Sequence, residues 1–177
     1  MVGDDRLRLF CGLRLPADAV ERVAAWQAAE LRGGRLVPPE NLHLTLAFLG
    51  HRPAAELPRV AAALRAAAAR GAGVRLRLLG YRETRSVAML TFEDEGGRAA
   101  AVAGALQRTL EQQGLYRRER RPWLPHLTVL RFSERPRLRP PLPELEPVVP
   151  SDAAVFISRL RPDGARYEAV ETVALGG

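Results

Sequence analysis

The sequence predicts an α/β (α+β) fold made of two similar halves. The same order of a strand, a helix and a proline-marked turn occurs twice along the 177 residues, and each turn leads into the pattern His-Leu-Thr-aliphatic. Hydrophobic residues make up 47% of the chain and charged residues 27%, as in globular proteins. The length suits one sizeable core better than two, so residues 1–177 are expected to form a single domain.

The elements of the first half follow from hydrophobic periodicity and from its interruptions. Two alternating runs predict strands, and a third strand carries the first His-Leu-Thr. Apolar residues at helical spacing predict two helices, the first stopped by Gly33–Gly34 and the second by Gly71. In chain order the expected elements are a strand over 6–15, a helix over 17–34, a strand over 42–50, a helix over 54–70 and a strand over 74–81.

The second half repeats this order and then adds a hairpin. The turn sequence Arg-Pro-Asp-Gly separates the last two strands, and the proline-rich segment 135–150 predicts a surface loop because proline interrupts helices and central strands. Long loops in compact domains are often functional. The expected elements are a strand over 86–93, a helix over 97–114, a strand over 126–132, and strands over 153–160 and 167–175.

Several classes of protein are disfavoured by composition. No window reaches the ~18 uninterrupted apolar residues of a membrane span, and the N-terminus has acids where a signal peptide has a basic region. We therefore expect a cytoplasmic protein. The single cysteine, Cys11, lies in an apolar run and predicts a buried thiol without a disulfide. No strong assembly stripe is present, which favours a monomer.

The formal charge is +7, and all 27 basic residues are arginine. The planar guanidinium matches phosphate oxygens and stacks on bases, which favours an RNA or nucleotide partner. A genome-wide bias towards Ala, Gly, Pro and Arg is the alternative explanation. The segment 117–121 reads Arg-Arg-Glu-Arg-Arg, with more arginines at 131, 135, 137 and 139. Both a phosphate-guiding patch and a solvated loop remain open for it.

The two His-Leu-Thr stretches are the candidate site. Side chains at i and i+2 of a strand share a face, so His43 lies beside Thr45 and His126 beside Thr128. Related halves would bring both pairs to a shared cleft. Two imidazoles can then act as acid and base near neutral pH, while hydroxyls and an arginine hold an anion. A phosphodiester fits this arrangement.

Other interpretations of the histidines are structural packing and a metal site. A lone histidine on an apolar strand is more often structural than catalytic, although the repetition favours catalysis. Metal binding is disfavoured because two histidines are too few for a typical zinc site and cysteine ligands are absent. The third histidine, His51, precedes Arg52–Pro53 and is expected in a surface turn.

These motifs resemble the two-histidine phosphoesterase superfamily, and within it the bacterial and archaeal RNA 2',3'-cyclic phosphodiesterases, also called LigT-like or 2'-5' RNA ligase proteins. The resemblance covers nearly the whole chain. It rests on RLFCGLRLP, PPENLHLTLAFLG, PWLPHLTVLRF and VFISRLRPDGARYEAV. It implies a bilobal, pseudo-two-fold fold with two antiparallel sheets flanked by helices around a central cleft. It also implies hydrolysis of 2',3'-cyclic phosphate ends of RNA, or of small cyclic nucleotides, to 2'-phosphomonoesters without a metal or cofactor.

The resemblance also implies residue roles. His43 would be the general acid and His126 the general base, while Thr45 and Thr128 would hold the phosphate oxygens. Pseudo-symmetry makes the acid and base assignments easy to exchange.

Arg131 matches an arginine that lies close to the phosphate in similar proteins. Strand alternation points it away from His126, so the match requires the strand to end or bulge near Leu130. Phe48 matches a nucleobase contact, yet alternation places it on the core face, where packing is the favoured interpretation.

Two other functions stay open. One is 2'-5' RNA ligation, the reverse reaction at the same site. The other is a non-catalytic RNA-binding module in which the histidines only line a groove.

Overall fold

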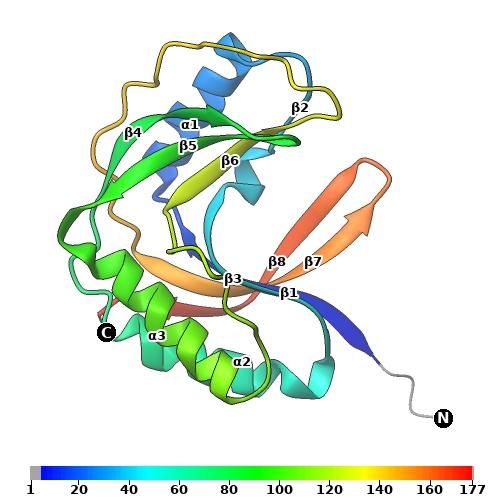
Figure 1. Ribbon diagram of the computed structural model, residues 1–177, viewed down its shortest axis with the longest axis vertical. Coiled ribbons are helices and arrows are strands. Elements are labelled where there is room, and N and C mark those ends of the chain that lie inside the picture. Colours follow the sequence, from blue (N-terminus) through cyan, green and yellow to red (C-terminus); the bar gives the residue numbers. More distant parts are fainter. Residues whose placement is uncertain (1–4, 177) are drawn as a thin grey trace.

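The computed structural model describes residues 5–176 as two four-stranded antiparallel sheets with three α-helices (Figure 1). The first sheet has the strand order β3-β1-β7-β8 and the second the order β2-β6-β5-β4. In chain order the elements are β1 (Arg6–Arg14), α1 (Ala17–Glu30), β2 (Arg35–Leu36), β3 (His43–Pro53), α2 (Leu57–Ala68), β4 (Leu76–Glu83), β5 (Val87–Asp94), α3 (Arg98–Gln112), β6 (His126–Arg131), β7 (Asp152–Arg161) and β8 (Gly164–Ala174).

The predicted duplication is confirmed in the order β1-α1-β3 and β5-α3-β6. In each half the first strand pairs antiparallel with the strand that begins at a histidine. The helices are exchanged between the sheets. The first half's helix α1 contacts the second sheet through Gln27, and the second half's helix α3 contacts the first sheet through Gln107. Helix α2 lies beside α3 (Figure 1).

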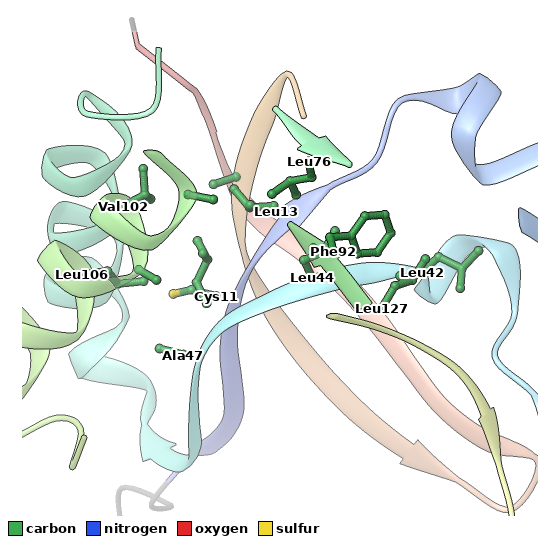
Figure 2. Close-up of a cluster of buried hydrophobic side chains, with 14 of the residues drawn as sticks. Cys11, Leu13, Leu42, Leu44, Ala47, Leu76, Phe92, Val102, Leu106 and Leu127 are labelled. Carbon is green, nitrogen blue, oxygen red and sulfur yellow. The ribbon is translucent and has the colours of Figure 1, made fainter. Parts of the chain in front are cut away.

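One hydrophobic cluster joins both sheets and all three helices. Figure 2 shows Cys11 of β1 facing Leu106 of α3, while Leu44 of β3 lies close to Phe92 of the second sheet. Leu44, Leu106 and Leu127 are fully buried. Cys11 is buried as predicted, and this burial raises the pKa of its thiol to about 12. The thiol therefore stays protonated at neutral pH.

The structure differs from the sequence prediction around Gly33–Gly34. Helix α1 ends at Glu30, and Leu31 is already extended. A Cβ at Gly34 would lie 2.4 Å from the carbonyl oxygen of Arg131, so this glycine allows a close approach to β6. The approach lets Arg35 and Leu36 form β2, an edge strand on β6 that the sequence did not predict.

The proline-rich segment 135–150 is a loop, as predicted, and it runs around the second sheet (Figure 1). The indole of Trp26 donates to the carbonyl of Pro141 at 2.7 Å, and Val148 forms a bridge with Leu76 of β4. The carboxylate of Glu83 accepts the backbone N–H groups of Arg137 and Leu138. These contacts cover the edge strand β4.

Candidate active site

A bulge in β3 determines which side chains face the cleft between the sheets. The pairing of β3 with β1 shifts by one residue between Cys11 and Gly12, so Leu46 is the extra residue of β3. Leu46 and Ala47 are both buried in consequence, and alternation is reversed after them. Phe48 therefore lies on the same side as His43, with 47% of its surface exposed. The expectation that Phe48 packs in the core was wrong.

The strand β6 carries a bulge at the equivalent place. Its pairing with β5 shifts between Ala88 and Met89, which makes Val129 the extra residue. Val129 and Leu130 are both fully buried, and Arg131 is exposed. The bulge that the sequence required near Leu130 is confirmed. Arg131 consequently lies on the same face as His126, at the position that Phe48 occupies in the other half.

Two glutamines hold these bulges. The side-chain amide of Gln27 donates to the carbonyls of Val37 and Val129, at 3.1 and 2.7 Å. The amide of Gln107 donates to the carbonyl of Leu46 at 2.8 Å. Leu46 and Val129 each lie three residues after a histidine, so the exchanged helices satisfy the bulge carbonyl of both halves in the same way.

The two histidines are oriented by the same hydrogen bond. Nδ1 of His43 lies 2.7 Å from the carbonyl of Asn41, and Nδ1 of His126 lies 3.0 Å from the carbonyl of Leu124. A carbonyl only accepts, so Nδ1 carries the proton in each ring and Nε2 is left for other partners. Nε2 of His43 accepts from the hydroxyl of Thr45 at 2.9 Å.

The environments of the two rings differ. His43 packs against Phe10, Phe156 and Tyr167, with ring centroids 4.7, 5.9 and 5.4 Å away. Burial among these rings lowers the pKa of His43 to about 4. The Asn41 hydrogen bond opposes this shift, whereas the positive charges of Arg131 and His126 add to it. Both groups are therefore close enough to His43 to influence its charge.

Hollows adjoin several of the predicted site residues. Thr45, Phe48 and His126 line one of about 580 Å³, here called the His126 pocket. Arg131 and Asn41 line another of about 270 Å³, here called the Arg131 pocket. Thr128 is half-buried on the His126 face, and within residues 5–176 neither its hydroxyl nor the Arg131 guanidinium has a partner. Thr45 and His126 thus share the His126 pocket, Arg131 lines the Arg131 pocket, and His43 lines a third hollow together with Asn41.

The remaining histidine, His51, lies outside this cleft. It belongs to β3, where it pairs with Arg8, rather than to a turn as expected, and it is exposed. Across the described range 5–176, no group of three or more His, Cys, Asp and Glu side chains could hold a metal ion. None of the helices in that range is long and apolar enough to cross a membrane.

The sequence profile of the 2'-5' RNA ligase superfamily matches residues 15–164, which include both histidine strands. The chain belongs to this superfamily. Among curated relatives, the RNA 2',3'-cyclic phosphodiesterase of Thermus thermophilus is 34% identical over 182 residues, covering 97% of this chain and 91% of the relative.

Solved structures of similar proteins superpose on nearly the whole of this chain. E. coli LigT complexed with 3'-AMP superposes with a TM-score of 0.81 at 25% identity, covering 97% of this chain and 99% of LigT. TT0787 of Thermus thermophilus superposes with a TM-score of 0.78 at 33% identity, again covering 97% and 99%.

In this 2'-5' RNA ligase superfamily member, sequence reasoning missed the residues that hold the histidines and the bulges. Gln27 occupies a core-facing position of α1, four residues after Val23 and four before Leu31, and is 2% exposed. A polar residue at such a position is a signal that could have identified it. Asn41 also contributes, because its side-chain N–H donates to the carbonyl of Ala165 and fixes the carbonyl that orients His43.

Proposed function

We propose that this protein is an RNA 2',3'-cyclic phosphodiesterase that hydrolyses 2',3'-cyclic phosphate ends to 2'-phosphomonoesters without a metal ion. The observation that carries the proposal is the matched pair of Nδ1–carbonyl hydrogen bonds, which place the Nδ1 proton of each ring on the backbone. Nε2 of His126 can then act on substrate directly, and Nε2 of His43 does so when substrate replaces the hydroxyl of Thr45. Membership of the 2'-5' RNA ligase superfamily and the name of the Thermus relative support it.

The chemistry assigns one proton transfer to each ring. Nε2 of His126 removes a proton from water, whose oxygen attacks phosphorus. The bond to O3' breaks, and O3' takes a proton from Nε2 of His43. Thr45, Thr128 and Arg131 stabilise the charge on the non-bridging oxygens. The acid role needs a proton that burial disfavours, so we infer that His43 is protonated when the anionic phosphate binds beside it.

The test is the turnover of a short RNA ending in a 2',3'-cyclic phosphate, in the presence of EDTA. Replacing His43 or His126 by alanine is expected to lower kcat by about 10²- to 10⁴-fold. His51→Ala is the matched control, because this exposed histidine lies on β3 outside the cleft. Near wild-type turnover in either cleft variant, or loss of activity with EDTA, would contradict the proposal.

The same assay separates the alternatives. A 2'-phosphate product end supports hydrolysis, whereas joined RNA with a 2'-5' linkage supports ligation. Binding without conversion would identify a non-catalytic RNA-binding module.

We also infer that residues 1–177 form one domain, monomeric and located in the cytoplasm. The large hydrophobic cluster that spans both sheets supports one domain, and light scattering of the purified protein tests the monomer.

A further inference from the structure

The His126 pocket extends to the arginine-rich segment 117–121. Thr45 and His126 line it, and so do Arg82, Arg117 and Arg121. The indole of Trp123 donates to the carbonyl of Thr45 at 2.9 Å and ties the base of this segment to β3. Arg117 and Arg121 are therefore carried on a segment fixed to β3, whereas Arg82 belongs to β4.

The segment presents alternate residues to the pocket. Arg117, Glu119 and Arg121 line it, whereas Arg118 and Arg120 do not. This spacing of two is that of an extended backbone, whose successive side chains point to opposite sides. The segment thus separates its arginines into a pair that faces the pocket and a pair that faces away from it.

The pocket arginines lack protein partners. Many other arginines are used structurally, as in the pairs Arg14–Asp152 and Arg52–Glu56, at 2.7 Å each. Within residues 5–176, the side chains of Arg82, Arg117 and Arg121 make neither hydrogen bonds nor ion pairs. Glu119 is the one acid that lines the pocket, so these four side chains carry a net charge of +2.

Exposed apolar surface accompanies this charge. Phe48 and Leu124 line the pocket and are 47% and 64% exposed, which is unusual for large hydrophobic side chains. An aromatic ring beside unpaired arginines is the combination that binds single-stranded nucleic acid, through base stacking and phosphate contacts. The Arg131 pocket differs, because Glu40 and Asp163 line it and Asp163 pairs with Arg166 at 3.2 Å.

We propose that the arginine-lined part of the His126 pocket binds the RNA strand on the 5' side of the reacting nucleotide, with Arg82, Arg117 and Arg121 contacting its phosphates. This proposal rests on the proposed function, which places the terminal phosphate between the histidines. A 2',3'-cyclic end has only one remaining connection, through its 5' oxygen, so the rest of the strand leaves the site in one direction. The consequence is selection for oligonucleotide ends over mononucleotides.

The test measures binding and needs no turnover. The probe is a fluorescein-labelled single-stranded tetraribonucleotide ending in a 3'-phosphate, followed by anisotropy over a range of salt concentrations; adenosine 3'-monophosphate competes for comparison. In the double variant Arg117→Ala/Arg121→Ala, the Kd for the tetranucleotide should rise about tenfold relative to the Kd for the mononucleotide. The slope of log Kd against log salt concentration should fall by about 1.4, because two phosphate contacts are lost. Arg118→Ala/Arg120→Ala removes the same charge from the same segment and is the matched control.

The outcomes separate cleanly. A selective loss in the Arg117/Arg121 variant, with the control near wild type, supports the strand path. Equal losses in both variants would show only a diffuse charge effect and would overturn it, as would an unchanged ratio of the two Kd values. Because hydrolysis is measured separately, an inactive wild-type protein would count against the proposed function and not against this binding result.

Discussion

Acidification should destabilise the protein through His43. Its pKa is about 4 in the folded state and 6.5 as an unperturbed group, so the unfolded chain binds the proton more tightly. Stability from this difference is fully present above pH 6.5 and is lost as the pH falls towards 4. Between about pH 7.5 and about pH 4.5 the two pKa values give a loss of about 2.5 kcal/mol in the free energy of unfolding.

Urea unfolding at both pH values, for the wild type and for His43→Gln, isolates this contribution. Other groups, such as Glu83 with its lowered pKa, contribute equally to both proteins and cancel in the difference. The wild type should lose about 2.5 kcal/mol more than the variant on acidification. Equal losses would refute the argument that His43 is held neutral by burial. Titration of the His43 ring by NMR should also show its pKa rising when inorganic phosphate binds.

Two further predictions concern Gln27, which bonds the bulge of β6, and Phe48, which follows the bulge of β3. Gln27→Leu leaves the carbonyl of Val37 without its side-chain partner. The free energy of unfolding, measured with urea, should fall by about 2–4 kcal/mol because a buried carbonyl loses its hydrogen bond. A change below about 0.5 kcal/mol would show that the amide is dispensable. Phe48→Leu keeps an apolar side chain but removes the ring, so KM for a cyclic-ended RNA should rise about five- to tenfold with kcat nearly unchanged. A fall in kcat with constant KM would argue against a binding role for Phe48.

The fold and the histidine pair could be predicted because they rest on local pattern. Strand and helix periods, the proline-marked turns and the repeated His-Leu-Thr stretch are all visible within short windows of sequence. Alternation placed Leu44 and Leu127 correctly in the core, since each lies before a bulge. It failed for Phe48, because the extra residue at Leu46 reverses the alternation until a second bulge at Leu49.

The remaining features depend on partners that are distant in the chain. Gln27 contacts Val129, which is 102 residues away, and Gln107 contacts Leu46, which is 61 residues away. Gly33–Gly34 indicated a helix end, but the backbone of Arg131 explains the need for glycine at position 34. The segment that carries Arg117 and Arg121 is likewise tied to β3 by Trp123, which contacts Thr45, 78 residues away.

The exchanged helices have a mechanical consequence. Helix α1 leaves β1 of the first sheet and is pinned to β6 of the second, while α3 leaves β5 of the second sheet and is pinned to β3 of the first. Moving the two sheets apart would break the Gln27–Val129 and Gln107–Leu46 hydrogen bonds together, so the two helices resist this motion jointly. The strands that carry His43 and His126 are therefore each held by a helix that follows a strand of the other sheet.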